Sequence, residues 1–298
     1  MRPVDRLTLG YLAVVAVLVA TSPARVDGAL GLLLGFGACG ALVVASAALA
    51  RRLPENRLVV YVRVGIFPAL TLFLYPAVER YALVLRGRFM DDDINTWESW
   101  AFGGPPNVLL DSVASPPLTE AMMACYFSFY LFALLPPLWL VARARPRDAE
   151  RYLYSQMLAV YLCYLGFLLV PLRGPASALS GEFSTPHLSG YGMTTLQTLI
   201  MTQDPVGACF PSAHVATAWA GLLAMRRIIS PTAFYTFLPL VCGITVAVVY
   251  NRYHYLSDAL AGLAVAFVAT AVGRRFEPCP PPPTLHRSSP HGHLRSVP

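Results

Sequence analysis

Eight apolar runs, each of about membrane-spanning length, constrain this chain more than any other feature of its sequence. A transmembrane helix needs about 20 mostly apolar residues, and within lipid only helices and closed barrels satisfy their backbone groups internally. With 56% hydrophobic and 13% charged residues, the chain is far more apolar than a soluble domain. We therefore predict an all-α polytopic membrane protein with about eight transmembrane helices. The runs are Leu7–Ala20, Ala29–Ala50, Val59–Leu85, Thr119–Ala142, Tyr152–Leu172, Ser212–Ile228, Thr232–Tyr250 and Leu256–Val272.

The first run is shorter than most of the others and follows a charged N-terminal segment, Met1 to Arg6. This arrangement is also typical of a signal peptide. No clear small-x-small cleavage site follows the run, so we favour a retained helix. Either alternative leaves the topology of the later helices unchanged.

Arginine is the only basic residue type apart from histidine, with 22 copies in the chain. The arginines concentrate in alternate connections between the apolar runs, the pattern that marks cytoplasmic loops. This pattern places both termini in the cytoplasm and the opposite loops outside it. The arginines form no continuous basic face, so nucleic-acid binding is disfavoured. Exclusive use of arginine suits a high-GC genome, and we expect a protein of the bacterial inner membrane.

Two polar clusters, residues 209–214 (CFPSAH) and 251–258 (NRYHYLSD), lie where apolar runs meet extracytoplasmic loops. Ionisable groups at such positions need partners and usually mark a functional site. His254 and Asp258 are four residues apart, which is one helical turn if a helix begins near Leu256. Asp258 can then accept the N–H of one ring nitrogen, leaving the other nitrogen of His254 as a nucleophile.

The first cluster combines helix-start signals with a second histidine. Pro211 suits the first turn of a helix, and Ser212 can cap it. Backbone N–H groups at such an end bind phosphate. His214, beside them, is placed to act as a general acid for a leaving group.

Each of these residues also has a structural alternative. His254 and Asp258 could be a hydrogen-bonded pair that only stabilises a helix end, and His214 could be a capping residue. Arg173 and Arg252 could extend toward lipid headgroups without binding substrate. The joint occurrence of both clusters favours the functional interpretation.

Pro211-Ser212-Ala213-His214 resembles the P-S-x-H motif of the type 2 phosphatidic acid phosphatase (PAP2) superfamily, and His254 to Gly262 resembles its H-x-x-x-D-x-x-x-G motif. Pro171 to Pro175 occupies the place of the remaining motif. The H-Y-x-x-D form is most similar to the Aur1-like branch, which contains inositolphosphorylceramide synthases and is akin to sphingomyelin synthases. The resemblance covers roughly Arg86 to Arg274.

The resemblance implies a six-helix catalytic core at residues 58–275, with two N-terminal transmembrane helices (residues 1–57) outside it. It implies that His254 attacks phosphorus and forms a phosphohistidine while Asp258 orients it, and that His214 protonates the leaving oxygen. Arginines and helix N–H groups can stabilise the phosphoryl charge, so the mechanism needs neither a metal nor another cofactor. The residues expected to hold the phosphate are Arg173, Ser212 and Arg252.

Two positions depart from the phosphatase form of these motifs. A lysine is expected seven residues before the arginine of the first motif, where this chain has Gly166. An arginine is expected six residues before the histidine of the third motif, where it has Val248. The catalytic histidines therefore carry over more completely than the phosphate-binding residues.

The connection from Arg86 to Pro117 begins with three acidic residues, Asp91 to Asp93, and becomes amphipathic around Trp97 and Trp100. Paired tryptophans predict a helix that lies along the membrane interface. It could admit a lipid substrate or serve only as an aromatic anchor. We expect the acidic run to be solvated, with a metal site as the less favoured alternative.

Other features carry less information. The six cysteines show no zinc spacing, and only Cys209, beside the predicted site, is expected to be open to modification. The aromatic run 126–130 is expected to pack between helices. Residues 276–298 form a Pro-rich segment that we predict to be a disordered cytoplasmic tail.

Three classes of function fit these observations. We favour an enzyme that transfers a phospho-headgroup between lipids, with a lipid phosphate or polyprenyl pyrophosphate phosphatase, which uses water as the acceptor, as the alternative. A catalytically inactive scaffold would be expected to lack a catalytic residue. A transporter would be expected to carry broken helices or a charged residue at mid-membrane, and Arg63 and Arg80 can both lie near span ends.

The partners implied are the bilayer and one or more lipids with a phosphate headgroup, and the sequence does not give the oligomeric state. We predict that the headgroup is selected by the loop from Pro175 to Ala208. No motif there identifies the lipid. The candidate polar residues are Glu182, His187, Tyr191 and Asp204.

Overall fold

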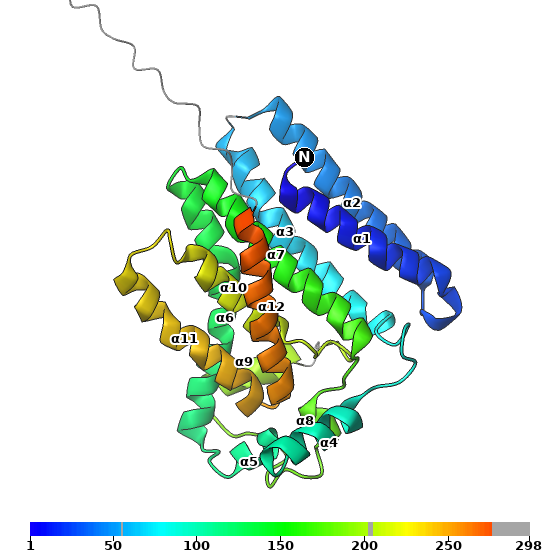
Figure 1. Ribbon diagram of the computed structural model, residues 1–298, viewed down its shortest axis with the longest axis vertical. Coiled ribbons are helices and arrows are strands. Elements are labelled where there is room, and N and C mark those ends of the chain that lie inside the picture. The colour runs from blue at the N-terminus through cyan, green and yellow to red at the C-terminus, as the bar shows by residue number, and fades with distance from the viewer. Residues whose placement is uncertain (55, 202–204, 276–298) are drawn as a thin grey trace, which may run out of the picture.

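A computed structural model describes residues 1–54, 56–201 and 205–275, and within these ranges the chain is helical and contains no strand (Figure 1). The protein is thus a polytopic all-α membrane protein, as the apolar runs predict. Its long helices are α1 (Pro3–Thr21), α2 (Ala29–Arg52), α3 (Arg57–Ala77), α6 (Pro116–Ala142), α7 (Pro146–Leu169), α10 (Ala213–Met225), α11 (Pro231–Tyr250) and α12 (Leu256–Arg275).

Seven of these helices are long and apolar enough to cross a membrane, as judged over the described residues. The eighth, α10, has only 13 residues and ends at Met225 rather than near Ile228. The expectation of about eight spans therefore becomes seven helices of spanning length and one shorter apolar helix. The predicted run Val59–Leu85 is likewise divided, because α3 gives way to a 3₁₀ turn at Val78–Arg80.

Local sequence explains where several helices begin. Proline occupies the first turn of α6, α7 and α11, where its missing N–H costs no intrahelical hydrogen bond. Asn56 and Ser230 cap α3 and α11 by accepting backbone N–H groups through their side chains.

Helix α7 lies at the centre of the bundle and is the most buried of the spanning helices. It packs against α1, α6, α10 and α12. Its polar side chains are satisfied internally: the Tyr152 hydroxyl and the Gln156 amide both donate to the Phe132 carbonyl of α6. Small residues permit the close helix packing, since a Cβ added at Gly221 would lie 2.6 Å from the Tyr152 hydroxyl.

The two N-terminal helices are in close contact with the rest of the bundle. The ring of Tyr11 stacks on Tyr161 of α7 with a centroid distance of 4.4 Å. Asp5 accepts two hydrogen bonds from Arg63 of α3, at 2.8 and 3.0 Å, and both side chains are buried. The sequence suggested that Arg63 lies near a span end, and the structure places it in the second turn of α3, in a buried ion pair with the first turn of α1.

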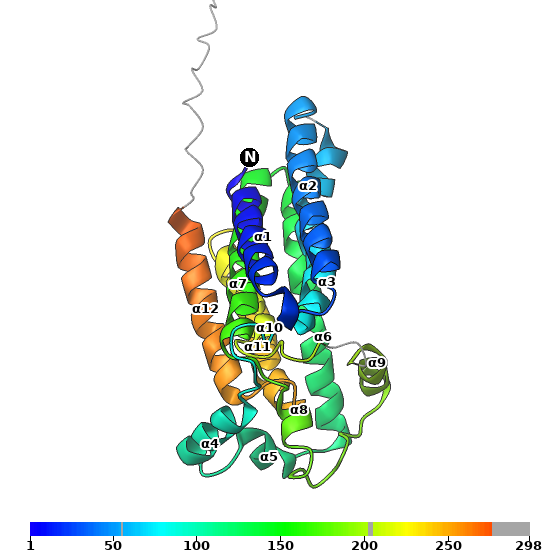
Figure 2. The same ribbon diagram turned by 90° about the vertical axis from the view of Figure 1, so that its right-hand side faces the viewer.

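Three of the four short helices lie at one end of the bundle, opposite the end where the N-terminus and the end of α12 lie, and the fourth lies beside α6 (Figures 1 and 2). A helix, α4, is present where the interfacial helix is predicted, and Trp100 on it is 82% exposed. The cytoplasmic or external position of this end remains a prediction. The short helices are α4 (Asp91–Phe102), α5 (Pro106–Asp111), α8 (Pro175–Ala178) and α9 (Gly192–Met201), and a 3₁₀ turn covers Pro23–Arg25.

Candidate active site

His254 and Asp258 lie at the start of α12, at the end of the bundle that carries the short helices. The helix begins at Leu256, so His254 lies just before it and Asp258 in its first turn. His254 Nδ1 is 3.3 Å from Asp258 Oδ2, which also accepts the Tyr255 N–H at 3.0 Å. Both side chains are buried. The structure thus brings the pair together in the arrangement that the four-residue spacing predicts.

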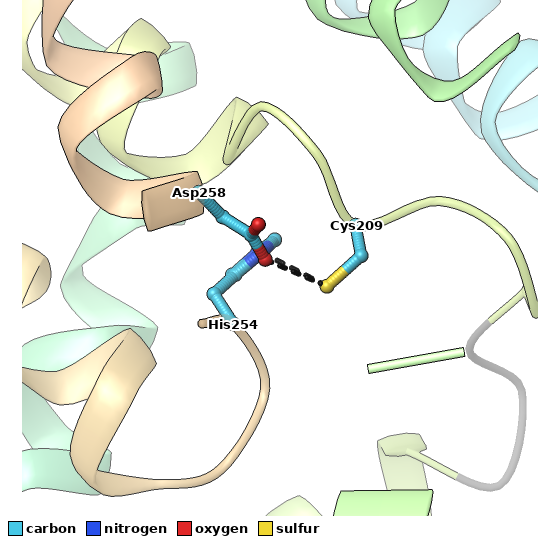
Figure 3. A group of neighbouring side chains, drawn as sticks. All are labelled: Cys209, His254 and Asp258. Carbon is cyan, nitrogen blue, oxygen red and sulfur yellow. Dashed lines mark hydrogen bonds and ion pairs between the residues drawn. The ribbon is translucent and has the colours of Figure 1, made fainter. Parts of the chain in front are cut away.

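Cys209 completes a compact group with this pair (Figure 3). Its Sγ lies 3.0 Å from Asp258 Oδ2 and 3.4 Å from His254 Nδ1. The expectation that Cys209 is open to modification is wrong for this conformation, because the residue is only 5% exposed. The three donor atoms lie within 4.8 Å of one another, a set that could hold a metal ion, and the hydrogen bonds among them account for their convergence.

His214 lies in the first turn of α10 and turns its ring toward His254, with 6.0 Å between ring centroids. Its Nε2 is 3.0 Å from the Tyr126 hydroxyl, and the Phe129 ring packs against it at 4.6 Å. Tyr126 was expected only to pack between helices. Its position within an apolar aromatic run carries no polar pattern, so this hydrogen bond could not be predicted from the sequence.

Ser212 caps α10, since its Oγ accepts the Val215 N–H at 3.4 Å. Helix α10 begins at Ala213, so Pro211 precedes the cap and does not lie in the first turn as expected. The Ser212 N–H donates to the Asp258 carbonyl at 2.9 Å, which ties the two motifs together. A Cβ at Gly262 would lie 2.6 Å from the Ser212 carbonyl oxygen, so this close approach requires glycine.

The Arg173 guanidinium is accessible to solvent. Its side chain is 53% exposed, stacks over Phe89 at 5.4 Å and lies 3.9 Å from the Asp91 carboxylate. Gly174 follows with a φ of +90°, and a Cβ there would be 3.3 Å from the Tyr253 carbonyl. Both the positive φ and the short distance to the Tyr253 carbonyl favour glycine at this position. The turn brings Arg173 close to the His254 loop.

Arg252 is held by protein groups and also lines a pocket beside the His254 loop. Its guanidinium pairs with Asp111, donates to the Thr185 carbonyl at 2.8 Å and stacks over Phe183 at 3.8 Å. Burial acts to raise the pKa of Asp111, but the hydrogen bonds from Ser184 and Arg252 outweigh it and lower that pKa. In this conformation Arg252 joins three loops at the site.

Two acidic residues that support the site were not recognised in the sequence. Asp91 is buried and accepts the backbone N–H groups of Arg173 and Gly174, so the expectation of a solvated run is wrong for this residue. Glu98, also buried, accepts the Ser257 N–H at 2.6 Å. The amphipathic pattern of α4 located the helix, but nothing in it marked these carboxylates as loop anchors.

The role of Asn107 at the site was also not predicted from the sequence. Its amide donates to the Val249 carbonyl at 2.8 Å and to the His254 carbonyl at 3.0 Å. It therefore fixes the backbone that carries the histidine. Its position after a Gly-Pro turn indicated only a loop.

The two departures from the phosphatase motifs have structural causes. A Cβ at Gly166 would lie 2.3 Å from Pro211 Cδ and 3.1 Å from the Phe210 carbonyl oxygen, so there is no room for lysine. Val248 is fully buried among apolar side chains, where arginine would be left without water or a counter-charge.

A pocket of about 590 Å³ opens beside the His254 loop. Of the residues expected to meet a headgroup, His187 lines this pocket, Glu182 and Tyr191 are exposed, and Asp204 lies outside the described residues. Asn251 and Gln197 also line it, and their buried amide groups hydrogen-bond to no described residue.

Comparison with known proteins assigns the chain to a family. Residues 93–272, more than half of the chain, match the model of the PAP2 superfamily. A PA-phosphatase related-family protein of Dictyostelium discoideum is 24% identical over 189 residues, which cover 56% of this chain and 34% of that protein. The chain thus spans about a third of that relative's length. No solved structure matches.

Proposed function

The chain belongs to the PAP2 superfamily, whose members are phosphatases or phosphotransferases, and we propose that it transfers a phospho-headgroup between lipids through a phosphohistidine at His254. The observation that carries this proposal is the hydrogen bond between His254 Nδ1 and Asp258 Oδ2, with His214 facing the same ring. A carboxylate at Nδ1 holds the proton there and leaves the Nε2 lone pair for attack.

In the first step His254 Nε2 attacks phosphorus, an N–P bond forms, and the bond to the leaving oxygen breaks. His214 gives its proton to that oxygen. The Asp258 carboxylate stabilises the positive charge that develops on the His254 ring. Arg173 and the N–H groups at the start of α10 stabilise the phosphoryl oxygens.

In the second step an acceptor hydroxyl attacks the phosphohistidine, its proton passes to His214, and the N–P bond breaks. The enzyme returns to its starting state, so the same residues serve a lipid hydroxyl or water. The Tyr126 hydroxyl, at His214 Nε2, holds the ring of this acid–base in position throughout.

Two observations support a lipid acceptor and the Aur1-like branch. Gly166 and Val248 replace the lysine and arginine of the phosphatase form, and packing excludes both larger residues. The amides of Asn251 and Gln197, which have no partner among the described residues, would be satisfied by a headgroup whose hydroxyls both donate and accept hydrogen bonds. A phosphatase is the second candidate, supported by the name of the Dictyostelium relative.

The test is product analysis in a defined bilayer. Purified protein would receive a donor lipid labelled on phosphorus, such as phosphatidylinositol, with and without ceramide or diacylglycerol, and His254→Ala would be the control. We expect the label to move to the acceptor lipid in a His254-dependent way. If free phosphate or headgroup phosphate were released equally with and without the acceptor lipid, the protein would be a hydrolase. Equal turnover by His254→Ala would contradict the phosphohistidine mechanism.

We further propose that the site faces the extracytoplasmic side and that both termini are cytoplasmic. The arginine-rich connections between α2 and α3 and between α6 and α7 lie at the end opposite the site, which supports this orientation (Figure 1).

A further inference from the structure

Helix α4 presents two buried carboxylates to the active-site loops. Asp91 and Glu98 are seven residues apart, which is nearly two helical turns, so both lie on the same face of α4. Both residues are at most 2% exposed. Helix α4 packs against α5, α8 and α12 and thus lies across the end of the bundle that carries the site (Figure 2).

Asp91 joins the turn that carries Arg173 to the loop that carries His254. Its Oδ2 accepts the Arg173 N–H at 2.9 Å, and its Oδ1 accepts the Gly174 N–H at 2.9 Å. The same Oδ1 accepts the Tyr255 hydroxyl at 3.2 Å. Burial and then the charge of Asp91 raise the pKa of Tyr255, so this hydroxyl keeps the proton that it donates.

These contacts hold the backbone of Arg173 and leave its guanidinium accessible. The Asp91 carboxylate therefore sets the distance between the Arg173 turn, which is proposed to bind phosphate, and Tyr255, the residue that follows His254. Removing it would leave the buried Gly174 N–H and the buried Tyr255 hydroxyl unsatisfied, each at a cost of about 1–3 kcal/mol, and would remove the acceptor of the partly buried Arg173 N–H.

Glu98 acts at the start of α12. Its Oε1 accepts the Ser257 N–H at 2.6 Å, while Asp258 Oδ2 accepts the Tyr255 N–H two residues earlier. Two backbone N–H groups at this helix end thus have acceptors, one supplied by α4 and the other by α12 itself. Because Ser257 directly precedes Asp258, fixing its backbone fixes the rotation of the Asp258 carboxylate relative to His254.

We propose that Asp91 and Glu98 are positioning residues that hold the phosphate-binding turn and the nucleophile in register from a single helix, α4. This inference rests on the proposed function. Neither residue contacts the reacting atoms, so their effect is on kcat through the geometry of Arg173, His254 and Asp258. A misplacement of about 1 Å in such a site can cost on the order of 10²-fold in rate.

The test compares Asp91→Ala and Glu98→Met with the conservative Glu98→Gln and with Asp92→Asn, a control at an exposed position of the same helix. We expect Asp91→Ala and Glu98→Met to lower kcat on the order of 10²-fold while KM changes by less than about threefold. Glu98→Gln keeps the acceptor oxygen, and burial already raises the pKa of Glu98, so it should retain activity within about threefold of the native protein.

Amide hydrogen exchange supplies a readout that does not depend on turnover. In Asp91→Ala, exchange should increase in residues 171–176 and 253–259, and in Glu98→Met it should increase in 255–259. Asp92→Asn should change neither segment.

The outcomes separate this proposal from the function on which it rests. Native kcat in folded Asp91→Ala and Glu98→Met, or exchange that is unchanged in both segments, would overturn the positioning role. Turnover that is the same in His254→Ala as in the native protein would refute the proposed function, and the exchange measurement would still decide whether α4 holds the two loops.

Discussion

The chemistry of the site depends on a few groups whose partners fix their orientation. His254 has its Nδ1 engaged by Asp258, and Asp258 Oδ2 also receives the Tyr255 N–H. Arg173 is held through its backbone and keeps an accessible guanidinium. The proposed nucleophile and its orienting carboxylate are thus both buried, whereas the proposed phosphate-binding cation is exposed.

Asp258→Asn tests the orienting carboxylate. An amide can still approach Nδ1 but cannot stabilise a charged imidazole, so we expect kcat to fall about 10³–10⁴-fold with little change in folding. Arg173→Ala should weaken turnover severely, by on the order of 10²-fold. Label-transfer rates would measure both, with the exposed Glu79→Gln as the control. Native rates in Asp258→Asn would show that the pair is structural.

The Arg252–Asp111 pair predicts a specific acid sensitivity. Because the folded-state pKa of Asp111 is lowered, its contribution to stability is present above the unfolded pKa of about 3.9 and is lost as the pH falls through the lower, folded value. Thermal unfolding of detergent-solubilised protein should therefore show a steeper decrease in Tm below about pH 4 for the native protein than for Asp111→Asn. Parallel curves would contradict this assignment.

At the scale of elements, the site depends on how closely two helices approach the loop before α10. Helix α7 meets Phe210 and Pro211 at Gly166, and α12 meets Ser212 at Gly262. Both contacts leave no room for a Cβ. The motifs therefore meet because small residues permit helix–loop packing at these two points.

Gly166→Ala tests this packing. Its Cβ would lie 2.3 Å from Pro211 Cδ, so the loop must move, at a cost of about 1–3 kcal/mol and with a decrease in kcat. Gly65→Ala is the matched control, since nothing lies within 4 Å of a Cβ there in another membrane-spanning helix. Chemical denaturation and turnover would be measured together. Equal effects of the two substitutions would refute the role of close packing.

Helix α4 also carries exposed aromatic residues, and Trp100 is 82% exposed. If α4 lies in the membrane interface, Trp100→Ala should raise KM for a lipid in vesicles by roughly 3–10-fold and leave kcat unchanged, which corresponds to about 1 kcal/mol of binding. Trp139→Ala, at the opposite end of the bundle, should change neither constant. A KM that is unaffected by Trp100→Ala would rule out the anchor.

At the scale of the whole molecule, the N-terminal helices are closely packed against the helices that carry the motifs. Residues of α1, α3 and α7 share one buried apolar cluster. The division into an N-terminal addition (1–57) and a catalytic core (58–275) remains a prediction. The Asp5–Arg63 ion pair crosses that boundary and provides a way to test it.

Asp5→Ala would leave the Arg63 guanidinium buried without its counter-charge, and breaking such a pair costs about 3–5 kcal/mol. We expect cooperative destabilisation of the whole bundle, measured as a lower Tm with a single transition. Replacing both residues (Asp5→Leu with Arg63→Met) should recover most of the loss. Two separate transitions would instead show that α1 and α2 unfold as an independent unit.

The sequence by itself determined the membrane-embedded helical architecture, because the hydrocarbon core fixes both the length and the apolarity of each span. It also determined the pairing of His254 with Asp258, because four residues make one helical turn. Contacts between residues that lie far apart in the sequence could not be predicted in this way. Asp91 lies more than 80 residues from the Arg173 turn, and Tyr126 is almost 90 residues from His214.

Only the tertiary structure decided these contacts. The local sequence pattern predicts a solvated run at Asp91, an interfacial helix at Glu98 and a loop at Asn107. These residues become supports of the site because the packing of α4 and α5 against the end of the bundle buries them beside unpaired backbone groups. A buried backbone N–H or carbonyl requires a partner, and the fold determines which side chain supplies it.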